Sequence, residues 1–457
     1  MPLQIRTGLM ALLLACAQHA VAEEGVATKE TNANSPPRVS DEFRRGKPGD
    51  GASGHGPVKI DHIMRVADAA DHGPVAVVNP SDYIIPPDED PFAFLQDGTD
   101  FISSLAKKMN LSFVPQMVYT YQHATKSNGP HGFSHIYTNI NGAMPFLAKE
   151  GNPVGHLLYN VQGNSGVGTQ SFPFINEYLG SPYFLNDVLT MSRLSLKKLW
   201  WRQDLVDKKF TINVGKLYYA NFFDMNAAAE DPTRQFLAAQ LTNNTAVPYP
   251  SYGFGAVGEW RINDESLVCF GSMNARASGV SSGFENLDEG RFFNMAQYTW
   301  TPKLHVDGND RQGHYRGFVW YSNDDIDYSE KGWGLGVSFD QDVGGGVTPF
   351  IRWGWAQEGA APASMCWSAG ATLNGVFERA HDGIGIAFCF SKINDFTQDI
   401  FGTGQVGGDW ETIIEAFWRI QVTKTLQISP DIQWFQSGES GGVSNTWIWG
   451  LRCTWNF

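Results

Sequence analysis

Seven charged residues are the first candidates for chemistry in this sequence. Each alternates with apolar residues along its own segment, so an extended chain places charged and apolar side chains on opposite faces. Carboxylates accept hydrogen bonds and guanidinium groups donate them, so charges of both signs on one wall suit neutral, hydroxyl-rich molecules. We expect these side chains to line a channel; the alternative is that they only brace the wall by cross-strand pairing. They are Glu259, Arg261, Arg352, Glu415, Arg419, Asp431 and Arg452.

Aromatic residues on the same faces offer a second kind of contact. Phe350 and Phe417 share the parity of the charged residues, and their rings are candidates to stack on sugar faces. Catalytic chemistry is less well supported, because a hydrolase needs Ser, His and an acid grouped at one site. His131, His135 and His156 lie near early strands without a serine motif, and no Cys/His metal spacing occurs. The sequence therefore predicts no enzyme, no cofactor and no metal, with a barrel-borne hydrolase as the weaker alternative.

The elements that must position these residues are strands. In the stretch 410–457, three segments alternate apolar and polar residues, and the chain ends on Phe457 in register with the apolar side. About sixteen such segments follow Leu111. Trp and Tyr gather near their ends, as in the aromatic girdles of membrane barrels. The sequence therefore predicts an all-β fold, an antiparallel transmembrane β-barrel of about 16 strands, over residues 110–457.

The connections between the predicted strands alternate in length. Barrels of this kind have short periplasmic turns and longer extracellular loops. The short connections are 263–265, 342–346, 379–382 and 422–424, and the long ones are 164–191, 221–253, 277–291 and 394–409. If the first strand starts at the periplasmic side, all of these short connections fall on the periplasmic side and all of these long ones on the extracellular side. This order predicts that the long loops share one end of the barrel.

Composition excludes several other classes. A formal net charge of -14 with no basic cluster argues against a nucleic-acid partner. No run of 18 or more apolar residues occurs after the N-terminus, which argues against a helical membrane protein. About 85 mostly irregular residues before the strands are too few for the plug of an energy-coupled transporter.

The N-terminal sequence indicates that the protein is exported. Residues 1–22 have the form of a signal peptide, with Arg6 before an apolar core and a small-residue cleavage site at 20–22. A lipoprotein box ending at Cys16 is the alternative. Residues 23–91 have the Gly-, Ser-, Pro- and charge-rich composition of a disordered periplasmic tether. Residues 92–109 predict an amphipathic helix that docks on the barrel, enters its mouth or lies on the surface.

Two blocks of residues resemble a known family, the carbohydrate-selective porins of the OprB type. The first block has Val214-Gly215-Lys216, Phe222-Phe223-Asp224-Met225-Asn226, Asp231-Pro232, Gln235-Phe236-Leu237, Leu241-Thr242-Asn243-Asn244 and Pro248-Tyr249-Pro250. The second has Glu415-Ala416-Phe417-Trp418, Ser429-Pro430-Asp431-Ile432-Gln433, Gly450-Leu451-Arg452 and the final Phe457. The resemblance runs from about residue 105 to the end. The long tether, the many Trp residues and four cysteines after the signal depart from the pattern.

The resemblance implies a sixteen-stranded barrel in a Gram-negative-type outer membrane, reached after secretion through the periplasm, through which sugars diffuse. Small sugars are the implied solutes and outer-membrane lipids the surroundings. The barrel-assembly machinery is expected to recognise Phe457, and a homotrimer is compatible with the family. Phe223, Asp224 and Asn226 are expected to pin a loop that folds inward. A general small-solute or ion porin without sugar selectivity remains the alternative.

Overall fold

The structure is a computed structural model of the whole chain. It describes residues 83–85, 90–91, 93–108, 111–149, 152–168, 175–190, 194–277, 282–285, 287–306, 308–326, 329–394, 410–438 and 442–457. The predicted signal peptide 1–22, Cys16 and the predicted tether as far as residue 82 lie outside the described residues.

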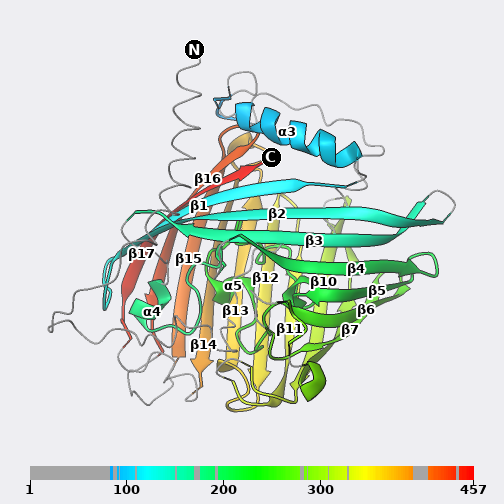
Figure 1. Cartoon of the computed structure of the whole chain (residues 1–457). Helices are drawn as coiled ribbons and strands as arrows, with labels where there is room; N and C mark the ends of the chain where they lie inside the picture. Colours follow the sequence, from blue (N-terminus) through cyan, green and yellow to red (C-terminus); the bar gives the residue numbers. More distant parts are fainter. Residues whose placement is uncertain are drawn as a thin grey trace, which may run out of the picture. The chain divides into compact units, whose positions relative to one another are not determined.

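Sixteen long strands form a closed antiparallel barrel (Figure 1). The first half is β1 Val114–Ala124, β2 Gly132–Lys149, β3 Asn152–Gly166, β4 Ser195–Leu205, β5 Phe210–Leu217, β6 Gly253–Asn263, β7 Ser266–Asn274 and β8 Phe292–Trp300. The second half is β10 Asn309–Ser322, β11 Gly332–Gln341, β12 Val347–Ala356, β13 Ala363–Asn374, β14 Gly383–Ile393, β15 Trp410–Gln421, β16 Leu426–Gln436 and β17 Thr446–Asn456. Neighbours in sequence pair throughout, and β1 pairs with β17 to close the ring. The predicted fold class is confirmed.

A short extra strand, β9 (Lys303–Val306), pairs only with the start of β10. It forms a small hairpin in the connection between β8 and β10. The connection between β8 and β10 is therefore structured, and β8 pairs directly with β10 across it.

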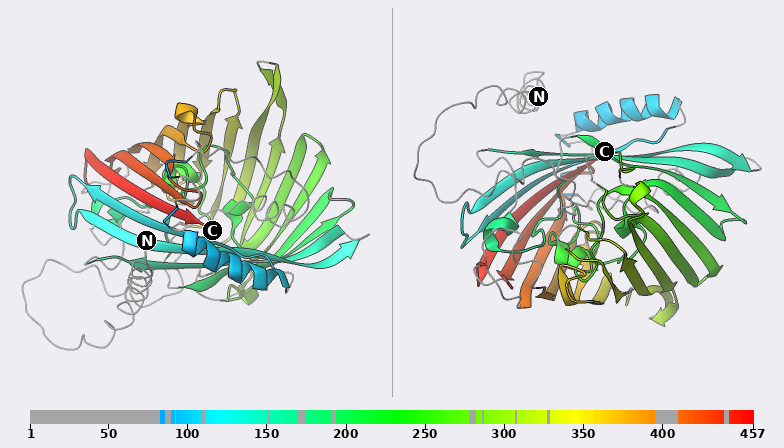
Figure 2. Two further views of the ribbon diagram at one scale, coloured as in Figure 1. Left: turned by 90° about the horizontal axis from the view of Figure 1, so that it is seen from above. Right: turned by 60° about the horizontal axis from the view of Figure 1, so that its bottom comes forward.

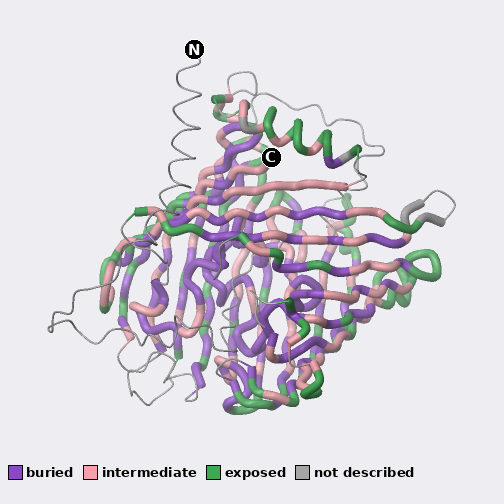
Figure 3. The backbone as a smooth tube through the Cα atoms, in the orientation of Figure 1, coloured by how far each residue is buried: buried purple, intermediate pink, exposed green. Residues whose placement is uncertain are grey.

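The alternation of side chains follows the predicted parity. On β15, Trp410, Ile414 and Trp418 are each about 40% exposed, whereas Glu411 and Glu415 are buried. Successive strand residues face opposite sides of a sheet, so the apolar set faces outward and the polar set faces the interior. Figure 3 shows the same alternation of burial along the strands. The outward apolar face is the one that a membrane requires.

Long and short connections also alternate around the ring. Two residues separate β6 from β7, and four separate β15 from β16. At the other end, 35 residues (218–252) separate β5 from β6. We call these ends the short-turn end and the long-loop end. Both views in Figure 2 place the C-terminus and helix α3 close together, and β17 ends at the short-turn end.

The helices are short apart from α3, which spans Ala93–Lys108. The others are α4 Ile175–Leu179, α5 Ala239–Thr242 and the 3₁₀ turns η4 Tyr219–Asn221, η5 Leu287–Glu289 and η6 Val376–Glu378. Among the described residues, no helix has the length and apolar character needed to cross a membrane. Just before α3, Tyr83 stacks on His381 at 5.5 Å, and Ile85 N donates to Val422 O at 2.8 Å. The end of the predicted tether therefore rests on two short turns.

Candidate functional site

The interior of the barrel holds a long loop, residues 218–252, which we call the inward loop. It contains η4 and α5, and it packs against the barrel wall with most of its residues buried. Phe236 lies between Phe350 and Phe417, with ring centroids 5.9 and 5.1 Å away. The prediction that Phe350 and Phe417 are free to stack on sugars is therefore wrong: both rings are about 5% exposed and hold the loop.

An ion pair fixes the start of the inward loop. Arg352 on β12 is fully buried, and its Nε donates to Asp224 Oδ1 at 3.2 Å. The same guanidinium donates to Asp224 O at 3.0 Å and to Leu241 O at 2.7 Å. One wall arginine thus holds two separate turns of the loop, which a planar fork of donors does well.

Asp224 is itself strained and buried. Its backbone has φ 55°, a left-handed conformation that few non-glycine residues adopt. Burial raises the pKa of the Asp224 carboxyl to about 6, although the positive charges of Arg352 and Arg316 oppose that rise. Its backbone N–H donates to Gln297 Oε1 on β8 at 2.8 Å.

Phe223 and Asn226 complete this anchor. Phe223 is fully buried with its ring 5.2 Å from that of Tyr219. Asn226 Nδ2 donates to Ser338 Oγ on β11 at 3.2 Å, and Asn226 Oδ1 accepts from Ala228 N. All three residues expected to pin the loop therefore contact the wall or the loop itself.

A second anchor holds the far part of the loop. Glu415 on β15 accepts hydrogen bonds from the backbone N–H groups of Leu237 and Ala238. Arg452 on β17 donates to the carbonyl oxygens of Pro232 and Gln235. These wall charges satisfy backbone groups that the folded loop would otherwise bury unpaired.

Sequence comparison gives the family. Residues 150–457 match the family described as "Carbohydrate-selective porin, OprB family". The match covers more than half of the chain and includes both loop anchors. The chain belongs to the OprB family of carbohydrate-selective porins. No curated protein sequence matches the chain.

Solved structures agree on the fold of this OprB-family chain. The high-pH structure of Pseudomonas putida OprB is similar, with a TM-score of 0.64 at 16% identity, covering 79% of this chain and 97% of that chain. The low-pH structure of the same protein gives a TM-score of 0.50 at 14% identity, covering 79% and 96%. The family and the barrel together give an outer-membrane location.

The seven residues predicted to line the channel fall into two groups. Arg352, Glu415, Asp431 and Arg452 are at most 4% exposed, and Arg419 is 8% exposed. All five face the interior, and the inward loop hydrogen-bonds to four of them: Arg352, Glu415, Arg419 and Arg452. The correction to the sequence prediction is that the first contact of Arg352, Glu415 and Arg452 is the loop backbone. Contact of any of them with a solute stays a prediction.

Arg419 and Asp431, the other two buried residues of the set, have different contacts. Arg419 donates to Asn374 Oδ1 at 2.8 Å and to Arg234 O at 3.4 Å, so it too reaches the loop. Asp431 interacts electrostatically with Glu415 and Arg452 on the neighbouring strands.

Glu259 and Arg261 lie apart from this cluster on β6. Glu259 accepts from Asn213 Nδ2 at 2.7 Å and from Arg202 at 3.4 Å, and Arg261 is exposed. The structure therefore does not bring the seven residues together into one ring.

Sequence reasoning missed a wall of amides on β2, β3 and β5. Asn160 Nδ2 donates to Asn139 Oδ1 at 2.7 Å and to Asn141 Oδ1 at 2.8 Å, and Tyr252 donates to Gln162 at 3.1 Å. All these amides face inward. The signal was present, since Asn139 and Asn141, like Asn160 and Gln162, are spaced by two.

Strand alternation also failed to identify two neighbouring inward-facing lysines on β4, for a different reason. The register of β3 and β4 shifts between Asn160 and Val161, so Lys197 and Lys198 both point inward. A bulge of this kind inserts one residue and breaks strict alternation. Lys198 Nζ donates to Asn221 Oδ1 of the inward loop at 2.7 Å.

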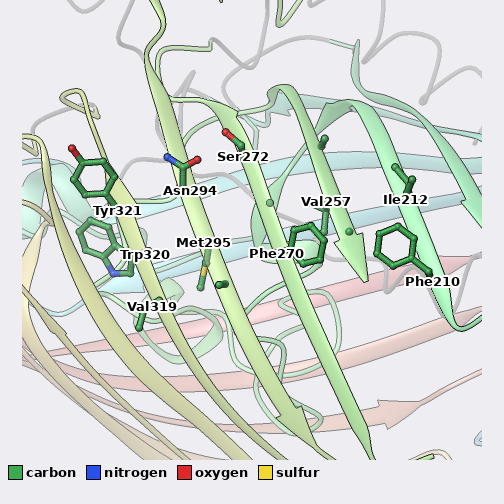
Figure 4. Close-up of a pocket in the computed structure, with 14 residues that line it drawn as sticks. Phe210, Ile212, Val257, Phe270, Ser272, Asn294, Met295, Val319, Trp320 and Tyr321 are labelled. Carbon is green, nitrogen blue, oxygen red and sulfur yellow. The ribbon is translucent and has the colours of Figure 1, made fainter. Parts of the chain in front are cut away.

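A hollow of about 580 Å³ lies on the outer surface of the barrel wall and not in the lumen. It lies over β5–β8 and β10, between Phe210 and Phe270 on one side and Val319 and Tyr321 on the other (Figure 4). Phe270, Val319 and Tyr321 are about half exposed on the outward face, so the hollow is outside the lumen. Within the described ranges, no group of three or more His, Cys, Asp or Glu side chains is arranged to hold a metal.

Proposed function

We propose that this OprB-family protein lets sugars and other small solutes diffuse passively across the outer membrane and catalyses no reaction. The observation that carries the proposal is the inward loop, held inside a closed barrel by buried charges on β12, β15 and β17. A fixed obstruction in a lumen limits the size of what passes and needs no energy source. The family match supports the same conclusion.

The β2–β5 wall is rich in uncharged amides, which are buried and hydrogen-bond to one another and to the inward loop. The loop's hydrogen bonds to charged wall residues go mainly to β12, β15 and β17, while the β2–β5 wall carries inward amides. An amide both donates and accepts hydrogen bonds without carrying charge, as a sugar hydroxyl does. Lys197, Lys198 and Lys216 on the same wall favour the second candidate, a general porin that also passes anions.

Planar bilayers and vesicle swelling separate these candidates. The purified protein should give discrete conductance steps, sugars should block the current with a saturating dose dependence, and vesicles should swell faster in small sugars than in larger ones. Conductance without sugar block or size dependence would favour the general porin. Absence of both conductance and swelling would reject the porin proposal.

The remaining features of assembly follow from this function. We propose that residues 1–22 direct secretion, that residues 23–91 tether the barrel on the periplasmic side, and that the short-turn end faces the periplasm. The barrel-assembly machinery would recognise the last strand through Phe457, which lies beside β1 with its N–H donating to Pro115 O at 3.3 Å. A homotrimer is proposed for the assembled porin, and chemical cross-linking in native membranes tests it.

A further inference from the structure

Helix α3 has an apolar stripe that the described residues of the protein leave uncovered. At 3.6 residues per turn, Phe94, Gly98, Phe101, Ile102 and Leu105 lie on one side of the helix. Phe101 is 65% exposed, Ile102 46% and Leu105 42%. Amphipathic helices normally bury this face against their own protein. Here three of the stripe's side chains are exposed, and Figure 3 shows exposed stretches along α3 in green.

The side of α3 that does meet the protein is small and polar. Ala106 is 5% exposed, its carbonyl accepts a hydrogen bond from Leu111 N at 2.9 Å, and Ser103 Oγ donates to Phe113 O at 3.5 Å. Gly98 gives an independent check from the middle of the stripe. A Cβ placed there would meet no described atom within 4 Å outside the glycine's own neighbours and helix backbone.

The position of α3 identifies what can cover the stripe. The helix leads directly into β1, lies beside β1 and β2, and sits at the short-turn end near the C-terminus (Figure 2). At that end of β2, Phe146 and Leu147 are 57% and 51% exposed, and Phe146 packs on Trp201 of β4. Aromatic residues of this kind mark the membrane interface of a barrel. The apolar stripe therefore continues the lipid-facing belt of the wall beside it.

Charge along α3 is consistent with an interfacial position. Asp97 and Asp100 are exposed and lie off the stripe, and the exposed Lys108 borders it in the last turn of the helix. The segment before α3 is held on the short turns, where Thr425 Oγ1 donates to Asp90 Oδ2 at 3.3 Å. Both ends of the helix are thus attached to one end of the barrel.

We propose that α3 lies in the headgroup region of the leaflet at the short-turn end, with Phe101, Ile102 and Leu105 inserted among the acyl chains. The occupant of the stripe is lipid, and neither the lumen nor a protein groove takes it up. An amphipathic helix buries its apolar face in this way at a membrane surface. The inference rests on the outer-membrane location and not on which solutes cross the barrel.

Spin labels on single cysteines test the proposal in the purified protein, reconstituted in vesicles of phosphatidylethanolamine and phosphatidylglycerol. Cys453→Ser serves as background, because Cys269, Cys366 and Cys389 are buried. Labels at Phe101→Cys and Leu105→Cys should collide with oxygen several-fold more than with a water-soluble nickel chelate. Labels at Asp100→Cys and Ser104→Cys, two exposed positions on the polar side of the helix, should show the reverse order.

Two results would overturn the proposal. Equal exposure of all four labels to the nickel chelate would show that the stripe stays in water. Low access of both reagents at positions 101 and 105 would show that protein covers it, and a spin–spin interaction there would identify a second copy of the chain. Conductance and sugar block measured on the same samples report on the porin function separately.

A stripe-removal variant gives a second readout. Phe101→Ser with Leu105→Ser should increase proteolysis of residues 93–108 in vesicles at least several-fold and leave the heat-modifiable barrel intact. Asp97→Ser with Asp100→Ser is the matched control on the polar side and should leave proteolysis unchanged. Equal proteolysis of the two variants would contradict insertion of the stripe.

Discussion

Replacing Arg352 with alanine should release the inward loop. The substitution removes three hydrogen bonds, to Asp224 Oδ1, Asp224 O and Leu241 O, that join β12 to two turns of the loop. It also leaves the Asp224 carboxyl buried without its partner. The loop should then leave the wall more often, because the undocked state returns that carboxyl to water.

The size of the effect follows from the burial of both partners, whose side chains are at most 3% exposed. Breaking a buried ion pair from one side costs about 3–5 kcal/mol. At about 1.4 kcal/mol per factor of ten, the docking equilibrium should shift by roughly a hundredfold to a few thousandfold. The other anchors, above all Glu415 and Arg452, keep the barrel itself folded.

Single-channel recording measures the shift. The Arg352→Ala channel should show frequent transitions to a higher conductance, and adding Asp224→Asn should suppress them in part, because a neutral side chain tolerates burial better. Arg379→Ala is the charge-matched control, since Arg379 pairs with Asp382 in a short turn away from the loop. If Arg352→Ala had the same current levels and dwell times as Arg379→Ala and the unmodified protein, the anchoring role of Arg352 would be refuted.

Four further predictions follow. The pKa of Asp224 rises from its ordinary 3.8 to about 6 in the docked loop, so the docked state binds a proton more readily than the undocked state. Docking should therefore be tightest near pH 4 and weaken as the pH rises through 6. Recordings of the Asp224→Asn channel should lose this pH dependence. Phe457→Asp should lower outer-membrane levels of heat-modifiable barrel, because it places a charge on the outward face; normal levels would contradict this. Arg419→Ala should shift reversal potentials toward cation preference and weaken sugar block, while the outward-facing Val337→Ala should do neither. Deleting residues 23–108 should leave a barrel that refolds and conducts, since the strands close on themselves without it; failure to refold would move the barrel boundary upstream.

The structure changes how the predicted channel charges should be tested. Arg352 and Arg452 were selected from strand parity alone, and both do face inward. Their guanidinium groups are occupied by backbone carbonyls of the inward loop. A loss of sugar block in either variant would therefore report a displaced loop as readily as a lost solute contact. Arg419 is slightly more exposed and joins the loop through a long hydrogen bond of 3.4 Å to Arg234 O, so it is less tied to the loop than Arg352 and Arg452.

The sequence by itself determined the barrel. A strand needs only a local period of two to present one apolar and one polar face, and that period is visible in the chain from Trp410 to Phe457. Connection lengths are also local, so the alternation of short turns and long loops could be predicted. Helix α3 was predicted within a residue at each end, because its 3.6-residue period is local too.

Only the tertiary structure decided what those faces touch. The pairing of Arg352 with Asp224 joins residues 128 positions apart, and Glu415 reaches a loop 177 positions away. No local period contains such distances, so the sequence predicted a free lining at Arg352, Glu415 and Arg452, which in the structure anchor the loop. The bulge that turns both Lys197 and Lys198 inward depends on the register with β3. The outward side of α3 likewise depends on which face the barrel leaves uncovered, and a single sequence pattern predicts an apolar face without saying what lies against it.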